Sequence, residues 1–322
     1  MVHQEEIILE KDDQYQDDIT QKADKFVWLH YENPDRDEVN EVLNHYHLPA
    51  HFGEYLFDKF ETSWIEYYHN EEGELFTYII LQYPFERESE PDAVFHTAPL
   101  VIVMSKDLVL TFVTHINMPF MLEIKNKHVP SGFPISSSYA FVMYMFFEVA
   151  QAYIEASSEL HATIRKAEEE GRHSTKNTAS YALIDVNRSL VYMSTAVGDN
   201  RDTLAGINRY FTHNENNTYY HERVLNRVQI EMHQAETMVK NNLALVEKLN
   251  DVLSNVISNN LNDVMSRLTI ITIVMTVPTI TAGLWGMNVA LPFEDNLHGF
   301  SIVVIGTLIL SMLVYYMFKK WQ

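Results

Sequence analysis

The sequence contains no cysteine and is poor in basic residues. None of its 322 residues carries a thiol, so neither a disulfide framework nor a thiolate metal site can form. Only 23 Lys and Arg stand against 44 Asp and Glu, which gives a formal net charge of -21. This charge argues against nucleic-acid binding, because phosphate contacts need clustered Lys and Arg. It is compatible with a soluble cytoplasmic surface or with one that attracts cations.

Several functional patterns are also missing. The sequence has no Gly-rich phosphate loop, no nucleophile elbow and no His-Glu-x-x-His. Nothing therefore favours an enzyme, and no organic cofactor is expected. The N-terminal segment Met1–Glu6 is charged and lacks the apolar core of a secretory signal peptide. We therefore expect the soluble part of the chain in the cytoplasm.

Gly and Pro are absent from residues 215–277. Apolar residues recur there with coiled-coil spacing in two neighbouring stripes, Leu245, Leu249, Val252 and Val256, and Leu253, Ile257, Leu261, Val264 and Leu268. A helix continuous to Leu284 would have about 70 residues and a length of about 105 Å. Because ordinary globular helices are much shorter, we expect this helix to pair with copies of itself or to form a stalk.

Residues 1–135 are predicted to form a cytoplasmic α/β domain. Short β-type and helical runs alternate there, and a mixed sheet covered by helices is the expected result. The predicted elements are strands at 7–9 and 25–30, a helix at 35–48, a hairpin of 65–68 and 75–81 around Asn70–Gly73, and a hairpin of 100–104 and 108–113 around Ser105–Asp107.

Residues 136–214 are predicted to be a helical cytoplasmic part. Tyr139–Glu170 is one helical pattern, and its apolar first half of about a dozen residues is too short to cross a bilayer. We therefore predict a buried core helix. Thr178–Val197 predicts a second helix, Gly198–Arg201 a turn, and Asp202–Arg209 a short helix.

Two uncharged apolar runs, Leu268–Phe293 and Gly299–Phe318, lie near the end of the sequence. Each is long enough to cross a hydrocarbon core of about 30 Å, which takes about 20 residues. Arg267 precedes the first run and Lys319 and Lys320 follow the second, whereas the connecting loop has no Lys or Arg. The positive-inside rule then predicts a membrane hairpin with both termini in the cytoplasm.

This pattern divides the C-terminal part into five segments. They are a stalk helix at 215–267, a first transmembrane helix at 268–288, an extracytoplasmic loop at 289–298, a second transmembrane helix at 299–318 and a basic cytoplasmic tail at 319–322. The plasma membrane is the expected location.

Polar residues share one face of the first run. Thr269, Thr272, Thr276 and Thr279 fall within about 80° of one another at about 100° per residue, with Asn262 and Met265 below them and Gly283 above. This stripe favours a wetted axis between identical helices, and an oligomer is required because two spans cannot enclose a pore. A second interpretation is helix packing, since small and hydroxylated residues also line membrane interfaces.

The first run also contains a proline and an apolar face opposite the threonine stripe. Pro278 predicts a kink that would move the stripe relative to the segment above it. The opposite face suits lipid or the second span and consists of Ile271, Ile273, Val274 and Val277.

The first run leads into Gly286-Met287-Asn288, which is followed by a short loop, a second span and a basic tail. In this arrangement, and in the stretch 262–271, the chain resembles the CorA-type divalent-cation channel family. The resemblance is strong over residues 230–322 and extends to the layout of the N-terminal part. It implies an α+β fold, in which an α/β sandwich that senses intracellular metal leads into long helices, and a homopentamer with the first spans around a central pore.

The resemblance also implies the residues of the pore. Asn288 would form a ring at the outer mouth, with Gly286 and Met287 completing a selectivity filter. The implied pore-facing positions are Asn262, Met265, Leu268, Thr272, Thr276, Thr279 and Gly283. The helical stripe alone leaves Leu268 off this face.

Such a filter suits Mg²⁺, which is reluctant to give up its water. Amide oxygens of Asn288 and carbonyl oxygens of Gly286 can bond to that water without stripping it, and they bind weakly enough to release the ion. Met287 is assigned to shaping the loop, because a thioether is a poor Mg²⁺ ligand. Met265 and Leu268 are candidates for an apolar constriction that gates by dewetting.

The sequence of the loop after the filter leaves transport of other divalent ions open. Many magnesium channels of the family have Met-Pro-Glu soon after the tripeptide, whereas this chain has Val-Ala-Leu-Pro-Phe-Glu-Asp at 289–295. Glu294 and Asp295 can gather cations at the mouth. We expect Mg²⁺ influx, with transport of Zn²⁺, Ni²⁺ or Co²⁺ as the alternative. A non-conducting, membrane-anchored coiled-coil scaffold is the alternative of another class.

Other polar residues carry weaker signals. Asp251 matches a stalk acid that the family uses in metal sensing, so Mg²⁺ is expected as a regulator as well as the substrate; the position is also typical of an exposed heptad residue. His45 and His47 do not share a helix face, and both are interpreted, with His51, as solvated. Glu168–Glu170 favours a solvated helix tip over a low-affinity cation site.

Overall fold

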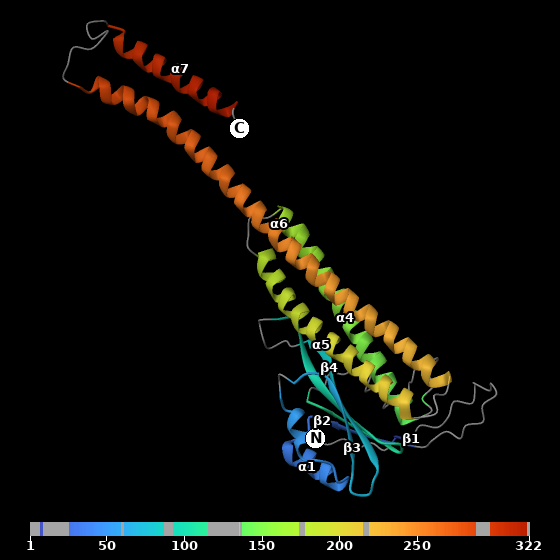
Figure 1. Cartoon of the computed structure of the whole chain (residues 1–322). Helices are drawn as coiled ribbons and strands as arrows, with labels where there is room; N and C mark the ends of the chain where they lie inside the picture. Colours follow the sequence, from blue (N-terminus) through green and yellow to red (C-terminus); the bar gives the residue numbers. More distant parts are fainter. Residues whose placement is uncertain are drawn as a thin grey trace. The chain divides into compact units, whose positions relative to one another are not determined.

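The structure is a computed structural model. It describes residues 7–8, 26–58, 61–86, 93–114, 135, 137–173, 178–214, 219–287 and 297–320. The chain forms two compact units, Met1–Asn250 and Asp251–Gln322. The first unit contains a sheet with its helices, and the second contains the end of a long helix and the C-terminal helix (Figure 1).

Six strands among the described residues form one mixed sheet, in the order β1-β2-β6-β5-β4-β3. β2 and β6 run parallel, and the other neighbouring pairs are antiparallel. The predicted mixed sheet is thereby confirmed. The strands are β1 (Ile7–Ile8), β2 (Val27–Glu32), β3 (Trp64–His69), β4 (Leu75–Glu86), β5 (Phe95–Met104) and β6 (Leu108–Val113).

Both predicted hairpins are present. In the turn between β3 and β4, Oδ1 of Asn70 accepts hydrogen bonds from the backbone N–H groups of Glu72 at 3.1 Å and Glu74 at 2.8 Å. Gly73 adopts a φ of 80° in this turn, a conformation that glycine reaches without steric cost. β4 and β5 are longer than predicted, because their outer ends continue to pair with each other.

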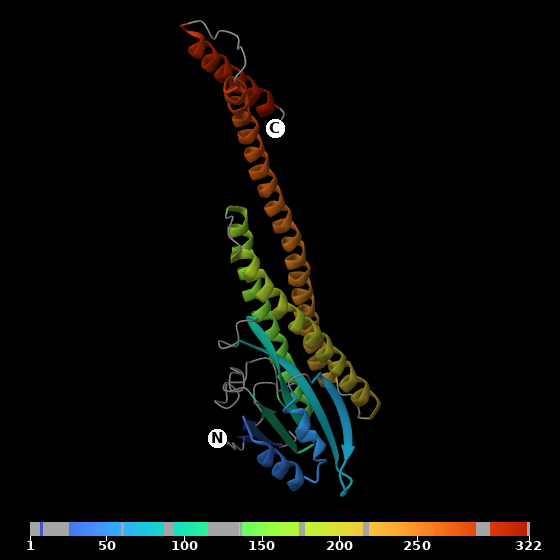
Figure 2. The same ribbon diagram turned by 90° about the vertical axis from the view of Figure 1, so that its left-hand side faces the viewer.

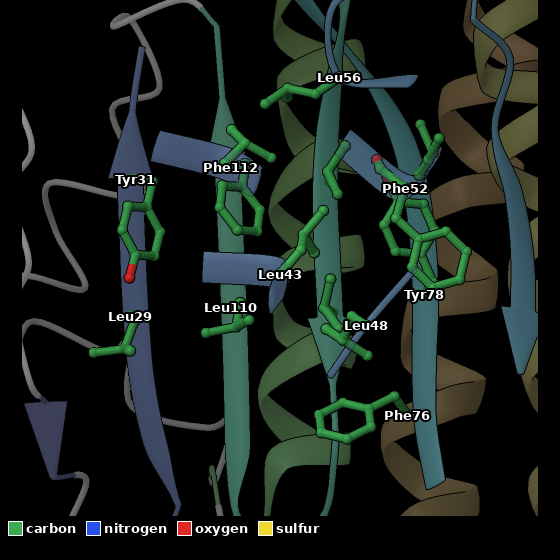
Figure 3. Packing of buried hydrophobic residues seen from close by; sticks show 14 residues of the cluster. Leu29, Tyr31, Leu43, Leu48, Phe52, Leu56, Phe76, Tyr78, Leu110 and Phe112 are labelled. Carbon is green, nitrogen blue, oxygen red and sulfur yellow. The ribbon is translucent and has the colours of Figure 1, made fainter. Parts of the chain in front are cut away.

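Two short helices, α1 (Arg36–His45) and α2 (His51–Tyr55), cover one face of the sheet. α1 begins with a capping box, in which the Asp35 and Glu38 side chains each accept a hydrogen bond from the other's backbone N–H. Figure 3 shows Leu43 and Phe52 from this helical layer packed against side chains of the strands, including Leu29, Tyr31, Phe76, Tyr78, Leu110 and Phe112.

Two long helices, α4 (Ser138–His173) and α5 (Thr178–Asn214), lie against β4 and β5. Phe141, Met145 and Val149 in the apolar first half of α4 are all 0% exposed. The prediction of a buried core helix is therefore confirmed.

The predicted turn at Gly198–Arg201 is wrong, because α5 continues through it without a break. Asn200 is 0% exposed. Its Nδ2 donates to the carbonyl of Gln82 at 2.7 Å, and its Oδ1 accepts from the N–H of Gln82 at 2.9 Å and from the hydroxyl of Ser63 at 2.6 Å. These contacts with the sheet favour the helix over the local turn signal, although Gly198 costs about 1 kcal/mol relative to alanine.

The long helix α6 extends over 67 residues, Tyr219–Trp285. The predicted continuous helix through the Gly-free and Pro-free segment is confirmed. In the first unit α6 lies beside α4 and α5 (Figures 1 and 2). The Glu231 carboxylate of α6 accepts from Gln151 of α4 at 2.8 Å, and Asn242 of α6 donates to the carbonyl of Ser157 at 2.8 Å.

Candidate functional site

The second unit is a hairpin formed by the end of α6 and by α7 (Gly299–Lys319). Both helices are long and apolar enough to cross a membrane. Figures 1 and 2 show α7 beside the last part of α6. The two predicted spans are thus present as helices, and they define the region where an ion pathway is expected.

One face of each helix is shielded by the other. On α6 the partly buried residues are Ile270, Ile273, Val274, Val277, Pro278, Thr281 and Trp285, and on α7 the shielded residues are Gly299, Val303, Thr307, Ser311 and Val314. Both sets recur every three or four residues, which places each set on one helix face. The shielded face of α7 contains Gly299, Thr307 and Ser311, small and hydroxylated residues of the kind that line membrane helix interfaces.

The threonine stripe of α6 lies on the opposite side. Thr269, Thr272, Thr276 and Thr279 are exposed, as are Asn262, Met265, Leu268 and Gly283. At about 100° per residue, the centre of this face is roughly half a turn from the face that meets α7. Of the residues expected on the opposite face, Ile273, Val274 and Val277 are partly buried, whereas Ile271 is exposed. The hairpin therefore leaves the threonine face uncovered.

Each hydroxyl of the stripe donates its hydrogen to the carbonyl four residues earlier. The bonds run from Thr269 to Met265, from Thr272 to Leu268, from Thr276 to Thr272 and from Thr279 to Met275, at 2.8, 2.8, 2.8 and 2.9 Å. A hydroxyl has one hydrogen and two lone pairs. With the hydrogen engaged in the helix, the oxygens on the exposed face remain as acceptors. Such a face is suited to groups that donate, including water bound to a cation.

The tripeptide after the first span is described only in part. α6 ends at Trp285, the N–H of Gly286 donates to the carbonyl of Ala282 at 2.9 Å, and that of Met287 to Leu284 at 3.3 Å. A Cβ at position 286 would lie 3.3 Å from the same Ala282 oxygen, so the backbone turns here with little room for a side chain. Predicted site residues Asn288, Glu294 and Asp295 lie outside the described residues.

Comparison with known proteins identifies the family. The model of the CorA-like Mg²⁺ transporter protein family matches residues 23–320.

The chain belongs to this family.

Individual relatives are distant. The chain is 21% identical over 234 residues to the putative metal ion transporter YfjQ of Bacillus subtilis, a match that covers 70% of this chain and 71% of that protein. The complete structure of the CorA magnesium transporter from Methanocaldococcus jannaschii has a TM-score of 0.74 at 19% identity, with 94% of this chain and 93% of that chain covered. At this identity the likeness concerns the fold, and it includes the sheet, the long helix and the apolar C-terminal helix.

A further likeness is to the cytoplasmic domain of ZntB from Vibrio parahaemolyticus. Its TM-score is 0.55 at 11% identity, and the match covers 74% of this chain and 88% of that domain. The family is one of metal-ion transporters, so the coarse prediction of a divalent-cation transporter in a membrane is supported by the family match.

The remaining candidate residues do not form a metal cluster within the described ranges. His45, His47 and His51 are exposed, as is Asp251 on α6. α4 continues beyond Glu168–Glu170 to His173, so these acids precede the end of the helix by one turn rather than forming its tip.

An ion pair with a buried carboxylate was not predicted from the sequence. The carboxylate of Glu236 on α6 is 5% exposed and accepts two hydrogen bonds from Nη1 of Arg201 on α5, at 2.7 and 2.8 Å. Lys240 donates a third at 2.6 Å. Burial raises the pKa of Glu236, but the hydrogen bonds and charges of Lys240 and Arg201 outweigh this effect and lower the pKa below its usual value. The sequence signal that could have revealed the pair is Glu236 itself, a charged residue among the apolar residues that α6 buries, which include Met232, Ala235 and Val239.

Proposed function

We propose that the chain is one subunit of a homopentameric channel in the plasma membrane that admits Mg²⁺ to the cytoplasm. The division of the first span into two faces carries the proposal. The apolar face packs on α7, and the face with Thr272, Thr276 and Thr279 is exposed. Because two helices cannot enclose a pore, the threonine face requires further copies of itself. The number five is proposed from the family resemblance.

Exposed apolar residues below the membrane support an oligomer. Val252, Ile257, Leu261 and Val264 are 52%, 45%, 60% and 62% exposed. Ile257, Leu261 and Val264 have coiled-coil spacing, Val252 belongs to the neighbouring stripe, and all four precede the basic residue that marks the membrane boundary, Arg267. Since lipid does not reach this segment, contact with other copies of α6 is the arrangement that removes these side chains from water.

The ion passes with its water retained. Mg²⁺ dehydrates reluctantly, and its bound waters donate hydrogen bonds outward. The acceptor oxygens of the threonine face would receive these bonds, and a ring of Asn288 with the carbonyls of Gly286 would hold the hydrated ion at the mouth. Met287 shapes this turn. Glu294 and Asp295 gather cations outside it.

The gate lies at the cytoplasmic end of the stripe. Met265 and Leu268 are 60% and 55% exposed, and five copies of each would form an apolar constriction that closes by dewetting. Asp251 lies on the same helix about four to five turns earlier. Carboxylates of Asp251 from neighbouring copies would bind cytoplasmic Mg²⁺ and favour the closed state when that ion is abundant.

Both termini are assigned to the cytoplasm. Arg267, Lys319 and Lys320 mark this side of the hairpin. Nζ of Lys319 lies 5.8 Å from the centroid of the Tyr315 ring, a contact suited to the interface, where aromatic and basic side chains anchor spans.

A second candidate is transport of Zn²⁺, Ni²⁺ or Co²⁺ by the same architecture. It is favoured by the likeness to the ZntB domain and by the loop Val289–Asp295, which lacks Met-Pro-Glu. Competitive uptake separates the two: excess Zn²⁺, Ni²⁺ or Co²⁺ should reduce Mg²⁺ uptake only weakly if Mg²⁺ is the substrate. A non-conducting scaffold predicts no uptake of any ion.

The filter is tested in liposomes loaded with a Mg²⁺-sensitive dye. Asn288→Ala and Gly286→Ala should each reduce Mg²⁺ influx strongly. Gly306→Ala on α7 is a matched control, because a Cβ there meets nothing within 4 Å. Unchanged influx in both filter variants would contradict the assignment of Gly286 and Asn288.

A further inference from the structure

Ser311 on α7 is a buried hydroxyl without a hydrogen-bond partner in the described part of the chain. Its exposure is 8%, and its Oγ is fully shielded from solvent. Thr307, one turn earlier on the same face, donates to the carbonyl of Val303 at 2.8 Å. Ser311 does not make the equivalent bond within its own helix. A buried hydroxyl without a hydrogen bond lowers the stability of the fold, because its desolvation is not compensated. We therefore expect a partner for this side chain on a neighbouring element.

The facing helix α6 contains a backbone carbonyl that can accept a hydrogen bond from the Ser311 hydroxyl. Pro278 lies inside α6 and has no N–H, so the carbonyl four residues earlier, that of Val274, loses its usual donor. Val274 and Pro278 both lie on the face that meets α7. The threonine hydroxyls of this span bond other carbonyls, those of Met265, Leu268, Thr272, Met275 and Val277.

The two groups lie at the same depth in the hairpin. Val274 precedes the end of α6 at Trp285 by eleven residues, and Ser311 follows the start of α7 at Gly299 by twelve. At 1.5 Å per residue these separations are about 17 and 18 Å. Matched in order from the loop, the shielded residues are consistent with this register: Thr281 would lie level with Val303, Val277 with Thr307, Val274 with Ser311, and Ile270 with Val314.

We propose that Ser311 is a positioning residue for the first span: its hydroxyl donates to the carbonyl of Val274 when α7 closes on α6. The bond is absent in the present conformation, where the Ser311 hydroxyl lacks a partner and Pro278 supplies no N–H to the Val274 carbonyl. Closure would supply a partner to both groups and would fix the direction of the helix on either side of Pro278, where a kink is expected. Its consequence for transport rests on the proposed pore, because a kink there would set Thr279 and Gly283 relative to Thr272 and Thr276.

A purely steric role makes a different prediction. If Ser311 were selected only for its small size, alanine would serve equally well. If the hydroxyl supplies the missing donor, alanine fails only while Pro278 is present. Pro278→Ala restores an N–H at position 278 and gives the Val274 carbonyl its ordinary helical partner. The two substitutions should therefore not add.

The absence of cysteine makes closure measurable in the full-length protein. With Ile270→Cys and Val314→Cys introduced together, the rate of disulfide formation reports contact one turn below Ser311. Ser311→Ala should slow this rate about threefold, the effect typical of one hydrogen bond between membrane helices. Thr307→Ala is the matched control and should leave the rate unchanged, because that hydroxyl bonds its own helix.

The decisive comparison is made in the Pro278→Ala background. There Ser311→Ala should have no effect on cross-linking. A second cysteine pair, Thr281→Cys with Val303→Cys near the loop, should cross-link at the same rate with and without Ser311. An unchanged rate in Ser311→Ala, or equal slowing with and without Pro278, would overturn the proposal. The readout does not require transport, so a protein that cross-links as expected but conducts no ion would refute only the proposed function.

Discussion

Thr276 and Thr281 make the same hydrogen bond on opposite sides of α6. The Thr276 hydroxyl donates to the carbonyl of Thr272 at 2.8 Å, and the Thr281 hydroxyl donates to that of Val277 at 3.0 Å. Thr276 is exposed, whereas Thr281 is partly buried on the side of α7. The two residues therefore have the same side chain and the same local hydrogen bond, but Thr276 lies on the uncovered threonine face and Thr281 lies on the face toward α7.

This pair gives a controlled test of the pore face. Thr276→Val keeps the shape of the side chain but removes the acceptor oxygen. If that oxygen receives hydrogen bonds from a hydrated ion, Mg²⁺ influx into dye-loaded liposomes should fall about tenfold, which corresponds to about 1.4 kcal/mol in the barrier. Thr281→Val should retain most of the influx. Equal losses in both variants would indicate a packing role for the threonines.

The ion pair between Arg201 and Glu236 holds α6 to α5 within the first unit. Arg201→Gln leaves the Glu236 carboxylate, which is 5% exposed, with Lys240 as its charged partner. We expect a loss of about 1 kcal/mol in the free energy of unfolding, since a hydrogen-bonded partner of a buried carboxylate is removed but the Arg201 side chain is 47% exposed, so solvent screens the pair. Thermal unfolding of the detergent-solubilised protein measures this loss. Lys166→Gln, at an exposed position of α4, should have no such effect.

The same carboxylate predicts an acid dependence of stability. Its folded pKa lies below the ordinary glutamate value of 4.5, so at a pH between the folded and the ordinary pKa the unfolded state binds a proton that the folded state does not. The stabilisation from Glu236 is thus present above 4.5 and is lost as the pH falls through the folded pKa. Glu236→Gln should flatten this part of the stability profile. A variant with an unchanged acid slope would contradict the assignment.

Gly198 lies inside a helix where the sequence predicted a turn. A Cβ at this position meets nothing within 4 Å. Gly198→Ala should therefore stabilise the protein by about 0.5–1 kcal/mol, because alanine favours the helix and restricts the unfolded chain. Asn200→Ala should destabilise it through the lost bonds to Gln82 and Ser63. A destabilising Gly198→Ala would instead favour the turn.

Some elements of the fold are determined by local sequence and others by contacts between distant residues. Hairpins were predictable from local turn residues such as Asn70 and Gly73, and the long helix from the missing Gly and Pro. The continuation of α5 was not predictable, because Asn200 is held by Gln82, a residue 118 positions away. Long-range contacts of this kind override local propensity.

The candidate site likewise has features that the sequence predicts and features that depend on packing. The threonine face followed from helical periodicity, since residues three and four apart share a face. The partners of Glu236, and the unbonded hydroxyl of Ser311, depend on which helices pack together, so a single sequence does not reveal them. The roles of Asn288 and Asp251 remain predictions from the family resemblance, and those of Glu294 and Asp295 remain predictions from their negative charge near the mouth.

The most direct test asks whether water and ions reach the threonine face. In the cysteine-free chain, Thr272→Cys, Thr276→Cys and Thr279→Cys are treated, one at a time, with a positively charged, membrane-impermeant thiosulfonate reagent during Mg²⁺ influx. The proposed pore predicts that modification at each of these positions blocks influx, and that Thr281→Cys, on the α7 side, is unaffected. Influx that persists after treatment of all three, or that is blocked only at Thr281→Cys, would contradict a pore lined by this face.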